Sequence, residues 1–185
     1  MKKKIAISIV AVALVLCCAI GGTLAWLTAT SGSVTNTFTV GNINIDLTET
    51  EREYKMVPGN QLDKDPTVVV KPNSEACYLF VEVEKSTNFD AFLEYAMATG
   101  WTQLVDGNGN KVDGVFYRVV DAATAKAGVS YPVLANNKVT VKGEVTKGQL
   151  DALTEATYPK LTFTAYAVQQ DNIADAYTAW THRNG

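Results

Sequence analysis

The chain has 185 residues, of which 16 are lysine or arginine and 19 are aspartate or glutamate, so its formal net charge is -3. Without a basic run beyond its first residues, it is not expected to bind the phosphate backbone of a nucleic acid, which requires clustered lysine and arginine. The length suits one domain with a hydrophobic core better than two.

The amino terminus has the order of features of a secretory signal peptide. Lysines at positions 2–4 precede the uncharged segment 5–20, and small residues then lead to Thr23-Leu24-Ala25. Small residues at the third and first positions before a cut are typical of signal-peptidase sites. The sequence therefore predicts cleavage after Ala25, with Trp26 as the new amino terminus.

An uncleaved membrane anchor is the alternative interpretation. A helix over 5–20 would reach about 24 Å, short of the ~30 Å hydrocarbon core, whereas a helix over 5–27 would span it. Cleavage would leave 160 residues (185 − 25) and remove three lysines, so the net charge would change from -3 to -6.

Two short segments after this junction alternate apolar and polar residues. The segments are 34–40 and 43–47, and the alternation slips by one residue at Gly41. A period of two predicts strands, and a glycine between them is typical of a bulge or corner.

The segment from Gly21 to Leu47, GGTLAWLTATSGSVTNTFTVGNINIDL, resembles the amino terminus of the TasA/camelysin (CalY) family of secreted proteins of Gram-positive bacteria. The family's junction matches at Gly22, Thr23 and Ala25, and its first strand matches at Asn36, Phe38, Gly41, Ile43 and Ile45. The residues TATSG after Trp26-Leu27 depart from the family pattern, which often has an acidic residue there.

The resemblance implies an export route, a fold and a function. The route is release by a SipW-type signal peptidase, and the fold is an antiparallel β-sandwich of jelly-roll type. The best-known relatives are subunits of extracellular biofilm-matrix fibres, in which the freed amino-terminal segment adds as a strand to a neighbouring subunit. The expected organisation is a signal peptide over 1–25, an arm over 26–37 and a sandwich with one or two short helices over 38–185.

The same pattern of alternation and turn residues predicts further strands downstream. They are expected at 68–70, 77–84, 101–105, 115–120 and 161–169, with turns at 56–60, 71–74 and 106–114. The strand starting at Cys77 is apolar on both faces, which predicts a central position with both sides covered. A hairpin is expected over 133–141, around a turn at 135–138.

Helical spacing of apolar residues predicts short helices at three places. They are 89–97 behind a possible Asn88 cap, 147–153, and the tail 173–180. The tail helix is expected to pack over the mouth of the sandwich, and a frayed tail is the alternative. The segment 122–128 is either a loop or one helical turn.

The sequence predicts no catalytic residue, metal ligand or cofactor. The camelysin branch carries a metallopeptidase label, but His182 is the single histidine, and familiar zinc peptidases use two or three. The run Asp106-Gly-Asn-Gly-Asn110 begins like a calcium loop, but Lys111 and Tyr117 stand where that loop requires glycine and glutamate, so a polar turn is expected. After loss of the leader Cys77 is the one cysteine left, which predicts a buried small hydrophobe. The charges at 63–65 are expected to be solvated.

Three functions remain open from the sequence. The first is a secreted fibre subunit that assembles with itself or a related subunit through Trp26, Leu27 and Val34 of the freed arm and Phe38 directly after it. The second is a monomeric secreted or surface-bound module for a carbohydrate or host protein, with Trp101, Tyr117, Tyr131 and Trp180 as candidate aromatic contacts. An extracellular hydrolase is the third hypothesis, and it has the least support.

Overall fold

The computed structural model describes residues 42–50 and 55–183, all within the unit Val40–Gly185. The predicted leader and arm lie outside the described residues, and with them Thr23, Ala25, Trp26, Leu27, Val34 and Phe38. Within the described ranges, no helix combines the length and the apolar character that a membrane crossing needs.

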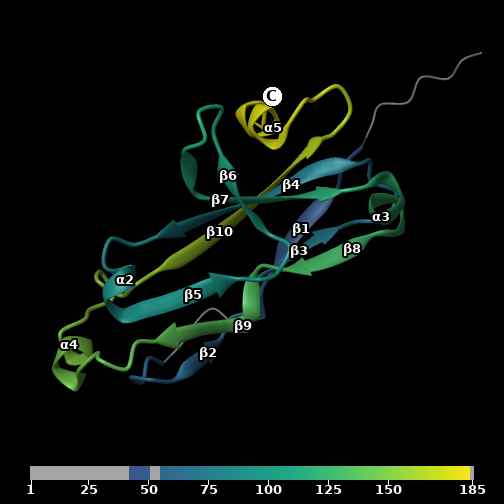
Figure 1. The fold of residues 1–185 in the computed structure, drawn as a ribbon. Coiled ribbons are helices and arrows are strands. Elements are labelled where there is room, and N and C mark those ends of the chain that lie inside the picture. The colour runs from purple at the N-terminus through teal and green to yellow at the C-terminus, as the bar shows by residue number, and fades with distance from the viewer. Residues whose placement is uncertain (1–41, 51–54, 184–185) are drawn as a thin grey trace, which may run out of the picture. The chain divides into compact units, whose positions relative to one another are not determined.

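The described part of the chain contains ten strands and four short helices (Figure 1). The strands are β1 (Ile45–Thr48), β2 (Gln61–Asp63), β3 (Thr67–Val70), β4 (Cys77–Lys85), β5 (Leu93–Met97), β6 (Thr102–Val105), β7 (Lys111–Val120), β8 (Val129–Pro132), β9 (Leu134–Val141) and β10 (Leu161–Gln169). The helices are α2 (Phe89–Phe92), α3 (Ala122–Ala127), α4 (Lys147–Asp151) and α5 (Ala176–Thr181). The all-β class is therefore confirmed, whereas the prediction of one or two helices is too low.

The strands pair antiparallel in three sheets. Their orders are β10-β4-β7-β6, β1-β3-β8 and β2-β9-β5. The two three-stranded sheets are built from the same two stretches of chain, because β2 leads into β3 and β8 leads into β9. Val133 N–H donates to the Pro66 carbonyl at 2.9 Å, which extends the β3–β8 ladder, and Lys64 N–H donates to the Asn137 carbonyl at 2.8 Å, which extends the β2–β9 ladder. The result is a sandwich-like arrangement in which these linked sheets and the four-stranded sheet share a core; the jelly-roll connectivity stays a prediction.

The strand β4 lies in the interior of the four-stranded sheet, as its sequence predicts. Leu79 and Val81 pack on one face, in a buried cluster that also contains Val68 and Val70 of β3. Tyr78 and Phe80 pack on the opposite face in a second cluster. Burial of such side chains contributes about 1.5–3 kcal/mol each, so β4 anchors both layers.

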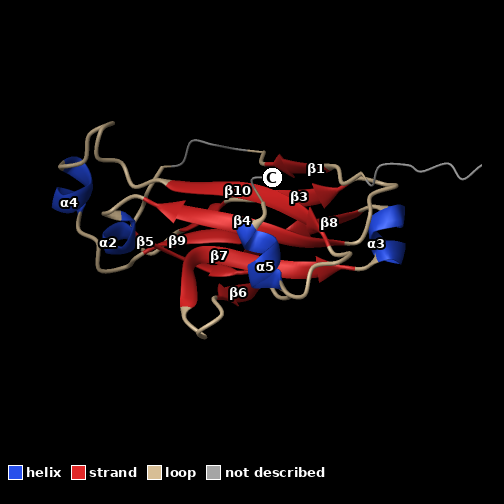
Figure 2. Cartoon of the chain, turned by 90° about the horizontal axis from the view of Figure 1, so that it is seen from above, coloured by secondary structure: helices blue, strands red, loops and turns tan. Residues whose placement is uncertain are grey.

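The helix α5 covers the outer face of the four-stranded sheet (Figure 2). It begins after Asp175, whose carboxylate accepts a hydrogen bond from Thr178 N–H at 2.7 Å. The Trp180 ring lies 5.3 Å from the Phe80 ring and 5.4 Å from the Tyr166 ring, centroid to centroid. The predicted terminal helix is confirmed, but it packs on a sheet face and not over the mouth of the sandwich.

The helix predicted over 89–97 is wrong after its first turn. α2 ends at Phe92, and residues 93–97 form β5, in which partly or fully buried side chains alternate with exposed Glu94 and Ala96. Asn88 does not cap the helix; its side-chain amide donates to the Thr157 carbonyl at 2.7 Å. Pairing with β9 outweighs the local helical spacing, which five residues specify only weakly.

The hairpin predicted over 133–141 is also wrong. Asn136 and Asn137 have positive φ of 54° each, as a turn would require, but β9 continues through them in one direction. Opposite them the register of β5 shifts between Tyr95 and Met97. Asn136 and Asn137 therefore form an irregularity within β9. The pairing of β9 with β2 and β5 keeps the strand running in one direction.

Most of the remaining predictions within the described residues agree with the structure in element type, but residues 111–114 of the turn predicted over 106–114 belong to β7. The strand predicted over 34–40 lies outside the described residues. Gly59 has φ of 78° in the predicted turn, β6 and β7 pair across the turn at 106–110, and α4 begins with a capping box at Thr146. The sequence did not predict β2 or β8, which have three and four residues and carry little alternation.

Candidate functional site

The outer edge of β10 is the candidate site for strand addition. β10 has nine residues and pairs only with β4 among the described strands, so it forms one margin of the four-stranded sheet (Figure 2). A sheet margin presents unpaired N–H and C=O groups, which another strand can satisfy.

The register of β10 shows which of its backbone groups face outward. Ser86 N–H donates to the Lys160 carbonyl at 3.0 Å and Gln170 N–H donates to the Ala76 carbonyl at 2.9 Å. Both pairs continue the register of β10 on β4, so the even-numbered residues bond to β4. The odd-numbered residues therefore direct their N–H and C=O groups away from β4. These are Leu161, Phe163, Ala165, Ala167 and Gln169.

The core is incompletely covered along this margin. Leu161, Phe163, Ala165 and Ala167 pack against the central core cluster, yet each stays partly exposed. On the neighbouring strand, Leu79 and Val81 of the same cluster are 0% exposed. An added strand would cover the apolar side chains of β10 as well as its backbone.

The other sheet margins are shorter or carry residues that oppose strand addition. β6 and β1 have four residues, and β1 contains Asp46. β8 ends in Pro132, β5 contains Glu94 and β2 has three residues with Asp63. β10 has neither charge nor proline, the residues with which natural proteins protect sheet edges.

The amino-terminal end of the described domain lies beside β10. β1 contacts β10 but is hydrogen-bonded to β3. The Asn42 carbonyl accepts from Glu75 N–H at 3.0 Å, next to the Ala76 carbonyl that receives Gln170 N–H. Asn42, the first residue that the structure describes, therefore lies near the carboxyl end of β10.

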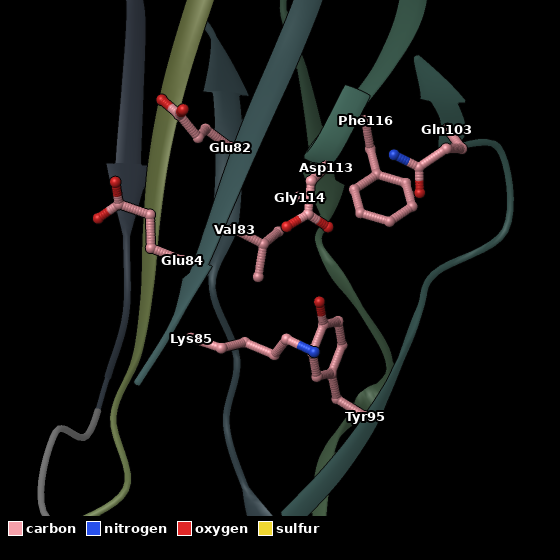
Figure 3. A pocket seen from close by; sticks show the side chains of 9 residues that line it. All are labelled: Glu82, Val83, Glu84, Lys85, Tyr95, Gln103, Asp113, Gly114 and Phe116. Carbon is pink, nitrogen blue, oxygen red and sulfur yellow. The ribbon is translucent and has the colours of Figure 1, made fainter. Parts of the chain in front are cut away.

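A cavity of about 630 Å³ lies where β4, β5, β6 and β7 meet (Figure 3). The Gln103 amide donates to the Val112 carbonyl at 2.7 Å and to the Val115 carbonyl at 3.0 Å, which fixes its orientation. Lys85 Nζ lies 2.7 Å from an Asp90 carboxylate oxygen, and this bond raises the pKa of Lys85. The lining residues are Glu82, Val83, Glu84, Lys85, Tyr95, Gln103, Asp113, Gly114 and Phe116.

Cys77 and His182 are the residues whose chemistry the sequence analysis considered. Cys77 is buried and its pKa is raised to about 11 by that burial, so the thiol is protonated at neutral pH. His182 is exposed, and its Nδ1 lies 2.7 Å from the Thr178 carbonyl. No group of three metal-ligating side chains occurs within residues 42–50 and 55–183.

The calcium-like run forms a polar turn, as its sequence predicts. The Asp106 carboxylate accepts hydrogen bonds from the N–H groups of Asn108 and Asn110, each at 2.8 Å. The bonds from Asn110 and Asn108 lower the pKa of Asp106. Of the charges at 63–65, Asp63 is exposed as expected, whereas Lys64 is largely buried and pairs with Glu49.

The four aromatic residues considered for ligand binding do not form an exposed platform. Trp101 and Trp180 are buried, at 9% and 6% exposure. The Arg118 guanidinium carbon lies 5.1 Å from the centroid of the Trp101 ring and 3.8 Å from the centroid of the Tyr131 ring. Tyr117 packs partly buried against the cluster under α5.

The candidate positions differ in how far the sequence reveals them. The alternation of residues 161–169 predicts β10 as a strand, but the sequence does not show that this strand lies at a margin of its sheet. The cavity residues Lys85, Tyr95, Gln103 and Asp113 come from four strands, and no motif relates them. Comparison of the chain with protein-family models, with curated proteins and with solved structures found no match.

Proposed function

We propose that the chain is a secreted structural subunit of an extracellular fibre, in which the processed amino-terminal arm of one subunit pairs with β10 of the next. The observation that carries the proposal is the nine-residue margin of β10, which has no charge and no proline. The resemblance of residues 21–47 to the TasA/camelysin family supports the same assignment.

The arm suits this margin in its sequence pattern. Residues 34–40, VTNTFTV, contain the end of the arm and the three residues after it. As a strand they would have three threonines on one face and Val34, Asn36, Phe38 and Val40 on the other. β10 likewise places Thr162 and Thr164 outside and apolar side chains toward the core. Threonine and β-branched residues favour such cross-strand pairs.

The energy available is comparable to the cost of association. Five odd-numbered residues of β10 each present one N–H and one C=O outward. At a net ~0.5–1.5 kcal/mol per hydrogen bond, a full ladder would contribute roughly 5–15 kcal/mol, against an association cost of about 4–15 kcal/mol. Burial of apolar side chains such as Phe38 must therefore supply the surplus.

Removal of the leader provides the control of assembly. Before cleavage the arm is continuous with the apolar segment 5–20, and afterwards it begins at Trp26 with a free end. The precursor is expected to stay monomeric, and the protein that begins at Trp26 is expected to form filaments.

Two complementary variants of the protein that begins at Trp26 test this scheme. Ala165→Pro removes an outward N–H and keeps the bonds to β4, so it should disable the acceptor margin. Phe38→Asp places a charge on the apolar face of the arm, so it should disable the donor. Each variant alone should stay monomeric, whereas their mixture should form one-to-one dimers without filaments.

The measurements are light scattering for mass and electron microscopy for filaments. Ala174→Pro serves as the control, because residue 174 is exposed in the connection before α5, away from the margin. Filaments formed by Ala165→Pro, or a mixture that stays monomeric, would contradict pairing of the arm with β10. A wild-type protein that stays monomeric at high concentration would contradict the fibre function itself.

A further inference from the structure

We propose that the cavity between β4, β5, β6 and β7 binds a neutral saccharide. The inference is independent of strand addition, because the cavity uses neither β10 nor the arm. Its volume of about 630 Å³ falls within the ~300–1,000 Å³ that is typical of small-molecule sites.

Three polar groups at the cavity have no hydrogen-bond partner among the described residues. They are the Tyr95 hydroxyl, the Asp113 carboxylate and the side-chain carbonyl of Gln103. Because both Gln103 donor bonds go to backbone carbonyls, its own carbonyl is held available as an acceptor. In Figure 3 the Tyr95 hydroxyl points toward the Asp113 carboxylate, and the Gln103 side chain lies beside the Phe116 ring.

The Tyr95 ring is partly buried against an apolar wall. The Tyr95 ring contacts the buried Phe89 ring edge-on, with centroids 5.9 Å apart. Burial, with a contribution from the charges of Asp90 and Asp113, raises the pKa of Tyr95, so the hydroxyl stays protonated and can donate. The Phe116 ring provides a further apolar surface on the lining.

The charges of the cavity exclude anions. Lys85 is the one cation on the lining, and it is paired with Asp90. The Asp113 carboxylate has no ion pair among the described residues, so the lining near it is negative. Glu82 and Glu84 point to the other side of β4, where the Glu82 carboxylate accepts from the Tyr166 hydroxyl at 3.1 Å. A phosphate or sulfate would therefore meet net repulsion.

The same groups do not suit a metal ion or a purely apolar ligand. Within the described ranges, no three metal-ligating side chains come together. An apolar ligand would displace water from the Asp113 carboxylate, which is exposed in the free protein, and from the Gln103 carbonyl without replacing the lost hydrogen bonds, which is costly. A ligand with several hydroxyl groups and an apolar ring face satisfies the acceptors, the Tyr95 hydroxyl and the aromatic surface together.

The experiment is a titration of the purified protein with defined sugars, followed by amide chemical shifts in NMR spectra. The probes are glucose, galactose, mannose, N-acetylglucosamine, maltose and cellobiose, with inorganic phosphate and ethylamine as charged comparisons. At least one neutral sugar should shift amides of residues 83–85, 95, 103 and 113–116. Tyr95→Phe and Asp113→Asn should each weaken its binding about two- to tenfold, the effect of one lost hydrogen bond.

Matched substitutions away from the cavity should leave sugar binding unchanged. Tyr158→Phe removes a hydroxyl from an exposed loop, and Asp171→Asn neutralises a carboxylate in the turn after β10. Failure of all six sugars, preference for phosphate or ethylamine, or unchanged affinity in both cavity variants would overturn the proposal. Because none of these substitutions touches β10 or the arm, filament formation should be the same in all four variants, which separates this result from the fibre proposal.

Discussion

Replacement of Gly114 by alanine should destabilise the domain through a collision with a backbone that cannot move freely. Gly114 lies in β7 with φ of 66°, and a Cβ built there would lie 2.4 Å from the Val83 carbonyl oxygen of the central strand β4. The left-handed backbone costs a residue with a Cβ about 1–2 kcal/mol. Relief of the overlap requires β4 and β7 to separate, which adds about 1–3 kcal/mol. The expected loss is therefore roughly 2–5 kcal/mol.

Gly59 provides a matched control for this prediction. It has φ of 78°, but an added Cβ would meet no atom within 4 Å, so Gly59→Ala carries only the backbone cost. Urea unfolding of both variants followed by circular dichroism gives the two free energies, because the midpoint shifts while the slope stays constant. Equal losses for the two substitutions would refute the steric argument and the close approach of β7 to β4.

Three further predictions test other parts of the structure. Thr164→Pro should cost about 1–3 kcal/mol in urea unfolding, because it removes an N–H bonded to β4, whereas Ala165→Pro should cost less; the reverse order would contradict the assigned orientation of β10. Trp180→Ala should lose about 3–5 kcal/mol, since the ring is 6% exposed in the cluster under α5, and a loss below 1 kcal/mol in the same assay would show that α5 contributes little. Burial raises the pKa of Cys77 from 9.0 to about 11, so stability should fall between these pH values by about 1.4 kcal/mol per unit, because the unfolded thiol loses its proton first. Comparison of pH-dependent unfolding of the wild type with Cys77→Ala checks this slope, which a parallel decline in both proteins would contradict.

The order of residues alone determined the fold class and several elements. Alternation over 161–169 and the two apolar faces of 77–81 predict strands, because side chains on a strand repeat every two residues whatever lies beside it. The apolar spacing of Ile173, Ala176 and Trp180 likewise predicts the terminal helix. These signals are local, so the sequence contains them completely.

The tertiary structure decided which local signals prevailed. Residues 93–97 fit a helical or an alternating pattern, and the ladder with β9 selects the strand. Asn136 and Asn137 adopt the backbone of a turn, yet the neighbouring strands keep β9 running straight on. Long-range hydrogen bonds outweigh local propensity at such positions, where local preferences differ by little.

The candidate sites depend entirely on tertiary structure. Nothing in the alternation of β10 distinguishes an outer strand from an inner one, because its neighbours come from residues 77–85 and not from adjacent sequence. Tyr95, Gln103 and Asp113 meet only because β5, β6 and β7 converge around the end of β4. The sequence specified which segments are strands, and the pairing of distant segments decided which margin stays open and which side chains surround a cavity.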